Sequence, residues 1–355
     1  MRDHPITNVT GPEQAAPAVA PRLLAWYDVH ARALPWRVGP AERAQGVAPD
    51  PYRVWLSEVM LQQTTVATVR PRFDRFLERW PTVADLAGAP REAVLAEWAG
   101  LGYYARARNL HACAAEVAER HGGRFPDTEE GLRALPGIGA YTAAAIAAIA
   151  FDRPATVVDG NVERVAARLF AETMPMPKAK PRLAALAARL TPAARPGCFA
   201  QSMMDLGATV CVPRRPACTI CPLVDLCRGR AEGIAESLPA KAPKRAKPTR
   251  QGIAYAAFDA EGRVGTVLRP DKGLLAGMRA LPTTDWAEDT PAPAPPVRAA
   301  WREAGSVTHV FTHFRLELVV MTVRLPTVTA PVAPAEARAS MPTVFRKALD
   351  RALGH

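Results

Sequence analysis

Residues 135–143 read LPGIGAYTA, which places two glycines, Gly137 and Gly139, at the start of a helix-like segment. Asp159 follows 20 residues after Gly139, a spacing also found in dinucleotide-binding fingerprints. Such a fingerprint needs a strand before its first glycine and Gly or Ala at its sixth position. Here the helical pattern EEGLRALP comes first and Thr142 occupies the sixth position, so the context of a dinucleotide site fails. The stretch instead predicts a hairpin between two helices.

The two glycines of this hairpin permit a tight turn that exposes backbone N–H groups at the start of the second helix. Those amides, together with the helix dipole, suit a single phosphate. Phosphate contacts of this kind position a protein on DNA without reading its sequence. We therefore expect Gly137 and Gly139 to contact a DNA phosphate, and a helix–helix turn without a ligand is the alternative.

The chain has 355 residues, of which 49% are hydrophobic, so it has room for two globular domains. Its formal net charge of +11 favours a polyanionic partner, although basic charge can also serve solubility alone. An apolar run of 18 residues is absent, and the N-terminus, MRDHPITNVTGPEQ, lacks the apolar core of a signal peptide. We expect a cytosolic protein without a membrane partner, in which disulfides are rare.

Composition and periodicity divide the chain into four expected parts. Residues 21–236 show helical spacing, and strand-like alternation begins only in GIAYAAFDAEGRVGTVLRP, after a basic, Pro-rich segment. The expected parts are a mobile N-terminal tail (1–20), an all-α domain (21–236), an extended linker (237–250) and an α+β domain (251–355).

Four cysteines lie within seventeen residues with the spacing C-x6-C-x2-C-x5-C, namely Cys211, Cys218, Cys221 and Cys227. Four thiolates so close together suit zinc or a [4Fe–4S] cluster, and the ligand set alone does not choose between them. The other two cysteines, Cys113 and Cys198, are expected to be small buried hydrophobic residues. The arginines around the four ligands suit either a DNA-contacting surface or a solvated face. They are Arg214, Arg215, Arg228 and Arg230.

The hairpin, the aspartate of VVDGNV and the cysteine spacing resemble, in this order, the endonuclease III superfamily of base-excision glycosylases. LPWR (34–37), PYRVWLSEVMLQQT (51–64) and GLGYYARARNLH (100–111) narrow the resemblance to the MutY-type adenine DNA glycosylases. That family removes adenine mispaired with 8-oxoguanine or guanine in double-stranded DNA. The resemblance implies a [4Fe–4S] cluster at residues 211–227. It also implies a helix-hairpin-helix glycosylase domain followed by a Nudix-like domain, and we expect a monomer in the bacterial cytoplasm, associated with the nucleoid when bound to DNA.

Tyr141 separates two branches of this superfamily, because members that also cut the DNA strand usually carry a lysine at the matching position. A phenol cannot form a Schiff base with the sugar C1′, whereas an amine can. The residue therefore predicts a monofunctional glycosylase. A bifunctional glycosylase/lyase for oxidised pyrimidines, a non-catalytic iron–sulfur DNA-binding protein and a zinc-stabilised module are the alternatives.

Cleavage of the glycosidic bond requires a proton for the departing adenine and stabilisation of the sugar cation, which two carboxyl groups can supply. The resemblance makes Glu58 the proton donor to adenine N7 and places Asp159 opposite C1′, with Tyr141 and Asn161 as hydrogen-bonding partners. Partial burial would raise the pKa of Glu58. Without the family context, Glu58 would be a surface glutamate and Asp159 the N-cap of the following helix, a role compatible with catalysis.

The adenine must leave the duplex to be reached, so the enzyme has to flip it out. By resemblance, Gln63 and Tyr103 wedge into the base stack. Ordinary core packing is the alternative for Trp36 and Leu61, two of the positions that match the family's adenine pocket. These positions are Arg32, Trp36, Arg37, Leu61 and Gln201.

The C-terminal domain resembles the family's Nudix-like domain through RPDKGLLAGMRALP (269–282). A catalytic Nudix box is absent, since REAG (302–305) is too little, so we expect no nucleotide hydrolysis. HVFTHF (309–314) resembles the family's lesion-sensing loop, with Phe311, Thr312 and His313 at the matching positions and Thr312 in place of the usual serine. A strand edge with a loop histidine is the alternative. Residues 37–50 form a longer link than in the family, and it could touch DNA or be a tolerated insertion.

Overall fold

The computed structural model describes residues 12–243, 247–270 and 273–354, and the chain divides into two units between Ala242 and Pro243. This division lies inside the predicted linker, 237–250. The linker is not extended from its start, because Leu238 is 3% exposed and the Met176 N–H donates to the Ala240 carbonyl at 2.8 Å. Burial of the leucine side chain among Ala166, Ala179 and Leu183 favours this packing on unit 1.

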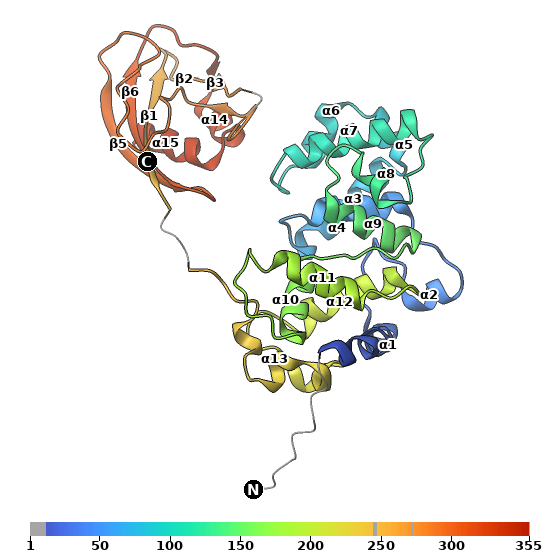
Figure 1. Cartoon of the computed structure of the whole chain (residues 1–355). Coiled ribbons are helices and arrows are strands. Elements are labelled where there is room, and N and C mark those ends of the chain that lie inside the picture. The colour runs from blue at the N-terminus through green and yellow to red at the C-terminus, as the bar shows by residue number, and fades with distance from the viewer. Residues whose placement is uncertain (1–11, 244–246, 271–272, 355) are drawn as a thin grey trace. The chain divides into compact units, whose positions relative to one another are not determined.

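Unit 1 is helical, as the sequence predicts (Figure 1). Among the described residues, no helix is both long and apolar enough to cross a membrane. The α-helices are α1 (Pro12–His30), α2 (Pro40–Ala44), α3 (Pro51–Leu61), α4 (Val66–Arg79), α5 (Val83–Gly88), α6 (Arg91–Glu97), α7 (Ala105–Arg120), α8 (Glu129–Arg133), α9 (Ala140–Phe151), α10 (Gly160–Leu169), α11 (Lys180–Leu190), α12 (Pro196–Thr209) and α13 (Arg228–Ala231). Short 3₁₀ turns are η1 (Cys218–Ile220), η2 (Val224–Leu226) and η3 (Ala235–Ser237).

The N-terminal segment differs from the mobile tail expected over residues 1–20. Helix α1 begins at Pro12, and Val19 and Leu23, one turn apart, are fully buried in the core of unit 1. Alanine has the highest helix propensity of all residues, and the buried Val19–Leu23 stripe fixes the helix on the core. Residues 1–11 lie outside the described part of the chain.

Helix α9 lies at the centre of unit 1 and is buried nearly all round, from Thr142 to Ile149. Helices α3, α8 and α12 pack against it. Its alanines let the neighbouring backbones come close: a Cβ on Gly197 would lie 2.4 Å from the Ala148 carbonyl oxygen. This packing fixes α3, α9 and α12 relative to one another, and each of them carries residues of the predicted site.

The predicted hairpin joins α8 to α9 and is confirmed. Thr128 caps α8 by accepting from the Gly131 N–H, and Gly139 is the N-cap residue of α9. Gly137 has φ +74°, and a Cβ there would lie 2.6 Å from the Cβ of Asn109, so only glycine fits the turn.

The long link over residues 37–50 contains the short helix α2. The Arg43 guanidinium donates to the carboxylate of Asp152 at 3.2 Å and to the Ile149 carbonyl, at the C-terminal end of α9. These contacts attach the link to unit 1, and its role towards DNA stays a prediction.

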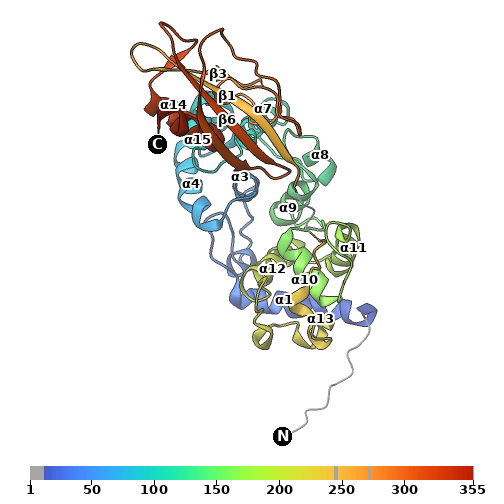
Figure 2. The same cartoon turned by 90° about the vertical axis from the view of Figure 1, so that its left-hand side faces the viewer.

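Unit 2 is mixed α and β, as expected. Its main sheet has the strand order β5-β6-β1-β2-β7, in which β1 and β6 pair in parallel over ten residues. Figure 2 shows β1 and β6 side by side. Helix α15 packs on β5, β6 and β1, and seven consecutive residues of β1 are buried, which is typical of a strand covered on both faces. The elements are β1 (Thr249–Phe258), β2 (Val264–Gly265), β3 (Val267–Leu268), β4 (Arg279–Ala280), β5 (Arg302–Val310), β6 (Arg315–Arg324), β7 (Pro331–Val332), α14 (Pro334–Ser340) and α15 (Thr343–Leu353).

Candidate active site

One cavity of about 660 Å³ in unit 1 gathers residues from five separate segments of the chain. The segment after α1, the end of α3, the start of α9, the start of α10 and helix α12 all contribute to its wall. Ten residues that the sequence singles out line it together: Arg32, Trp36, Arg37, Glu58, Leu61, Gln63, Tyr141, Asp159, Asn161 and Gln201.

Glu58 reaches this cavity from the last turn of α3 and is 7% exposed. Burial raises its pKa from the ordinary 4.5 to about 7; the hydrogen bond from Tyr141 and the charge of Arg37 lower it, and the charge of Asp159 raises it. The Tyr141 hydroxyl donates to Glu58 Oε2 at 2.8 Å. A carboxyl group with this pKa is partly protonated near neutral pH and can act as a general acid.

Asp159 is the N-cap residue of α10 and lines the same cavity. Its Oδ1 accepts from the backbone N–H groups of Asn161 at 2.9 Å and Val162 at 2.7 Å, and its Oδ2 accepts from Asn161 Nδ2 at 2.8 Å. The positive end of the helix dipole therefore lies beside this carboxylate. The interpretation of Asp159 as a helix cap is confirmed. Capping is compatible with a catalytic role, because the same carboxylate lines the cavity. The two carboxyl groups share one cavity but have opposite surroundings, one desolvated and one capped.

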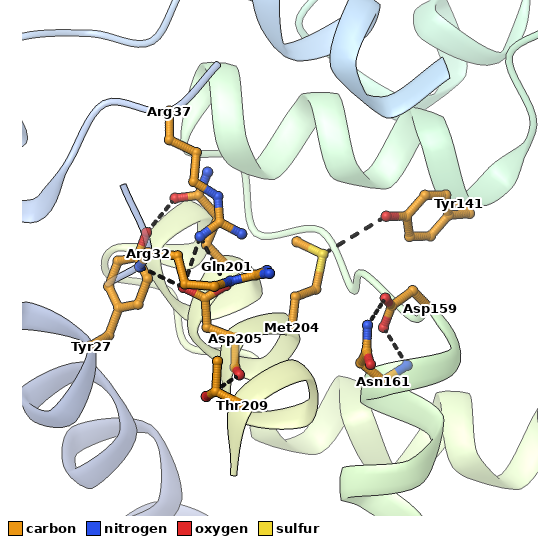
Figure 3. A network of polar contacts seen from close by, with 10 residues as sticks. All are labelled: Tyr27, Arg32, Arg37, Tyr141, Asp159, Asn161, Gln201, Met204, Asp205 and Thr209. Carbon is orange, nitrogen blue, oxygen red and sulfur yellow. Dashed lines mark hydrogen bonds and ion pairs between the residues drawn. The ribbon is translucent and has the colours of Figure 1, made fainter. Parts of the chain in front are cut away.

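Asp205 is the residue of this site that sequence reasoning missed. It is fully buried in α12 and accepts from Arg32 Nε at 2.6 Å, from the Arg32 backbone N–H at 3.0 Å and from Arg37 Nη1 at 2.8 Å (Figure 3). The available signal was an acid inside the apolar run MMDLGA, one helical turn after Gln201. Asp205 forms an ion pair with both arginines and fixes where the guanidinium groups lie at the cavity wall.

The remaining wall residues combine structural and cavity-lining roles. Trp36 is 6% exposed and packs edge-on against Phe73, with ring centroids 5.3 Å apart. It therefore belongs to the core and also lines the cavity. Leu61 packs on the same core from the cavity side. The Tyr27 hydroxyl donates to Gln201 Oε1 at 2.7 Å, so the NH₂ group of Gln201 is the part that can donate to a ligand.

The two predicted wedge residues lie on loops. Gln63 lines the cavity directly after α3, whereas Tyr103 lies in the loop before α7, does not line it and is 66% exposed. Both adopt left-handed backbone conformations, with φ +57° at Gln63 and φ +49° at Tyr103. Non-glycine residues adopt this conformation rarely, and mostly where the surroundings enforce it.

The three predicted lesion-sensing residues lie in the hairpin loop between β5 and β6 of unit 2. Phe311 is half-buried and stacks on Trp286, with ring centroids 5.7 Å apart, so it is part of an aromatic cluster. Thr312 and His313 are exposed at the tip of the loop. REAG, the fragment considered as a Nudix box, lies in strand β5 and not in a helix.

The four predicted cysteine ligands line one small cavity beside α10 and α13. Among the described residues, no three candidate ligands come together as a site for a single metal ion. Four cysteine thiolates around one shared cavity are the ligand set that iron–sulfur clusters use. The donor set therefore fits an iron–sulfur cluster held by Cys211, Cys218, Cys221 and Cys227.

Two arginines of α10 hold the loop that carries these cysteines. Arg168, which is 1% exposed, donates to Cys211 Sγ at 3.2 Å and to five carbonyls, including those of Val212 and Pro213. Arg164 donates through Nε to the Cys211 carbonyl at 2.8 Å and through Nη2 to Asn161 Oδ1 at 2.8 Å. A continuous hydrogen-bonded path therefore joins the cysteine loop to Asp159.

Replacing Arg168 by leucine should lower the free energy of unfolding by about 3 kcal/mol or more, because several buried carbonyls lose their donor, each at about 1–3 kcal/mol. It should also reduce the visible absorbance of the bound cluster, because the loop that carries Cys211 loses its anchor. Denaturant unfolding and the visible spectrum measure the two effects. Arg120→Leu, which removes an exposed ion pair with Glu116, is the control. A change no larger than the control's would contradict this role of Arg168.

Comparison with known proteins places this geometry in a class. Residues 56–189 match the HhH-GPD superfamily base excision DNA repair proteins. Residues 211–227 match the iron-sulfur binding domain of endonuclease III, which confirms the expected iron–sulfur site, and residues 253–351 match the NUDIX domain. A helical hairpin beside a two-carboxylate cavity and a four-cysteine loop therefore defines a base-excision repair protein.

Relatives of known function narrow the class. Adenine DNA glycosylase of Mus musculus is 38% identical over 89% of this chain and 72% of the relative. The enzyme of Homo sapiens is 37% identical over 87% and 68%, and that of Mycobacterium tuberculosis is 39% identical over 81% and 88%. The chain belongs to the adenine DNA glycosylase family, which confirms the resemblance seen in its motifs.

Solved structures agree on the fold of unit 1. A thermostable thymine-DNA glycosylase matches with a TM-score of 0.54 and 27% identity, covering 62% of this chain and 98% of that one. A non-covalent endonuclease III–DNA complex matches with a TM-score of 0.51 at 24% identity over the same shares, which shows the fold alone.

Proposed function

We propose that this chain removes adenine mispaired with 8-oxoguanine or guanine in double-stranded DNA, by hydrolysis and without cutting the strand. The observation that carries the proposal is the pair of carboxyl groups, Glu58 and Asp159, in one cavity with opposite surroundings. Pairs of titratable groups whose environments differ in this way mark the acid and the stabilising base of a reaction.

In the proposed reaction, the adenine is flipped out of the duplex and enters the cavity. Glu58 donates its proton to N7 while the bond between N9 and C1′ breaks, and the bonding electrons leave with the base. Asp159 stabilises the sugar cation, and water then adds to C1′ while its proton passes to the Glu58 carboxylate, which restores the acid. Tyr141 and Asn161 keep the two carboxyl groups in place through the hydrogen bonds described above.

The cavity wall suits a purine. A volume of about 660 Å³ has room for the base and part of its sugar, and ligand sites of this kind combine apolar walls with a few fixed polar groups. Trp36 and Leu61 supply apolar surface. Arg32, Arg37 and Gln201 supply donors that Asp205 and Tyr27 hold in position. Gln63 and Tyr103 would fill the space that the flipped base leaves.

That the enzyme does not cut the strand is inferred from the kinds of nucleophile that line the cavity. None of the described residues that line it is a lysine, and Tyr141 occupies the position at the hairpin. Burial, followed by the charges of Glu58 and Asp159, raises the pKa of Tyr141 well above its ordinary value, so the phenol stays protonated as a donor. Without an amine beside C1′, no Schiff base forms and the strand stays intact.

In unit 2, Thr312 and His313 are proposed to contact the base opposite the adenine, because both are exposed at the tip of the β5–β6 loop. Phe311 supports that loop from the aromatic cluster below it. Gly137 and Gly139 are proposed to bind a DNA phosphate at the hairpin of unit 1. We expect no nucleotide hydrolysis from unit 2.

The test is incubation with a duplex that holds one A:8-oxoguanine pair, followed by alkali treatment of half the sample. We expect breaks at the adenine only after alkali, since alkali cuts the abasic site that base removal leaves. A duplex with an oxidised pyrimidine is the control and should stay intact. Breaks without alkali would indicate a glycosylase/lyase instead, and a bound but unbroken duplex would indicate a binding protein.

A further inference from the structure

Arg106, in the first turn of α7, has a guanidinium group that bonds both to the end of α3 with the loop that follows it and to the loop before α7. Arg106 does not line the 660 Å³ cavity, so its guanidinium group lies outside the space where adenine is proposed to bind. Its partners are the carbonyls of Val59 (2.9 Å), Met60 (3.0 Å), Leu101 (2.7 Å) and Gly102 (3.2 Å) and the hydroxyl of Thr64 (3.2 Å).

These partners form two groups. Val59 and Met60 belong to the last turn of α3, where carbonyls have no partner within the helix and a cation is favoured by the dipole. Leu101 and Gly102 belong to the loop that leads into α7. The planar guanidinium, with five donors in a fixed geometry, can serve both groups together, whereas a lysine ammonium has three donors around a point charge.

Two of the partners, Thr64 and Gly102, are directly adjacent to the two strained loop residues. Gln63, with φ +57°, directly precedes Thr64, and Tyr103, with φ +49°, directly follows Gly102. The Tyr103 ring also lies 5.6 Å from the Arg106 guanidinium carbon. Trp98 adds a further restraint, because its Nε1 donates to the Gly102 carbonyl at 3.0 Å. Both strained residues are therefore held through the same cation.

We propose that Arg106 is a positioning residue that fixes Gln63 and Tyr103 relative to one another, so that their side chains enter the base stack as one rigid pair. This inference rests on the proposed function, because it assigns the pair to base flipping. Arg106 acts through the two loops and makes no contact with the reacting atoms. Its loss should therefore slow the extrusion of a stacked, paired adenine far more than the chemistry on an adenine that is already unpaired.

The experiment compares two duplexes under single-turnover conditions with the complete holoprotein. One has an A:8-oxoguanine pair, and the other has the adenine opposite an abasic-site analogue, where little pairing must be broken. Arg106→Lys keeps the charge and should lose about tenfold or more on the first duplex and less than about threefold on the second. Arg108→Lys, on the same helix, is the matched control, because its side chain makes no hydrogen bond or ion pair with residues that the structure describes.

A second readout follows flipping directly. 2-Aminopurine placed beside the adenine becomes brighter when its neighbour leaves the stack, and Arg106→Lys should reduce and slow this rise. Equal losses on both duplexes, or no loss on either, would overturn the role of Arg106. If Arg106→Lys does not fold, Thr64→Val removes one acceptor beside Gln63 and should give a smaller loss with the same selectivity; an equal loss overturns the proposal. Wild-type protein that releases no adenine from either duplex would refute the proposed function, while the fluorescence still reports on Arg106.

Discussion

Replacing Glu58 by glutamine should slow the release of adenine from an A:8-oxoguanine duplex about a thousandfold, within the range that general acids contribute. Glutamine has nearly the same shape and still accepts the hydrogen bond from Tyr141, so the cavity should keep its geometry. It cannot donate a proton to adenine N7. Single-turnover rates measure the loss, and fluorescence anisotropy with the same duplex should show that binding is preserved.

The same substitution has a pH-dependent effect on stability, whose sign follows from the raised pKa of Glu58. The folded protein holds this proton up to about pH 7, whereas the unfolded chain releases it near pH 4.5. Wild-type stability therefore falls as the pH rises from 4.5 to 7 and is lowered by a constant amount above that. Relative to wild type, Glu58→Gln should be more stable by about 3 kcal/mol at pH 8 and by little at pH 4. Denaturant unfolding at the two pH values measures this difference.

Wild-type activity should also decline as the pH rises above about 7, because Glu58 loses the proton it donates. Glu116→Gln, in an exposed pair with Arg120, is the control and should leave rate and stability close to wild type. A full rate in Glu58→Gln would contradict the mechanism. A loss of rate without the gain in stability at pH 8 would show that Glu58 is not held in a desolvating site.

Replacing Gly207 by alanine should slow base release about a hundredfold, because misplacement by about 1 Å at a reacting group costs this much. An added Cβ would lie 2.5 Å from the Cβ of Asn161 and 3.1 Å from its Cα, so the start of α10 must move away. Asp159 moves with it, since Asn161 donates two hydrogen bonds to the Asp159 carboxylate. Helix propensity alone predicts a gain in stability and no loss of activity, since alanine favours a helix over glycine by about 1 kcal/mol.

Gly88→Ala is the matched control, because an added Cβ at Gly88, also in a helix, meets nothing within 4 Å. Rates and unfolding free energies of both variants separate the two effects. A Gly207→Ala protein with the activity of wild type would mean that α10 can shift without moving Asp159 from the reacting sugar.

The features predicted from the sequence are those that a short stretch of chain specifies. Gly137 of the hairpin needs a backbone conformation that other residues avoid, and the cysteine spacing brings four thiols together locally. The motif around Glu58 is equally local, although its burial depends on helices that come much later in the chain.

Asp205 and Arg106 could not be predicted in this way. Asp205 bonds to Arg32, which lies 173 residues earlier, and Arg106 bonds to a carbonyl that lies 46 residues earlier. Backbone carbonyls leave no trace in a sequence, so the partners of Arg106 are visible only once the fold is known. The start of α1 was missed for a similar reason: Val19 contributes to a core whose other members lie far along the chain.

Phe311 shows the reverse case, in which a motif points to function and the fold adds a structural role. The sequence offered a lesion contact or a strand edge, and the ring stacks on Trp286, which lies on a separate segment of unit 2. Thr312 and His313 keep their exposure at the loop tip. Which of these three residues packs inward and which stay exposed depends on the aromatic cluster, and no local sequence pattern predicts that cluster.

Asp159 caps helix α10 as well as facing the cavity, and asparagine is as good an N-cap as aspartate. A chain carrying Asp159→Asn should therefore fold, accumulate and occupy the mispair like the intact enzyme, while leaving the adenine in place. In a cell that makes both proteins, the variant would interfere by occupying the mispair, not by lowering the amount of folded protein. Because the variant folds normally, protein quality control would not remove it.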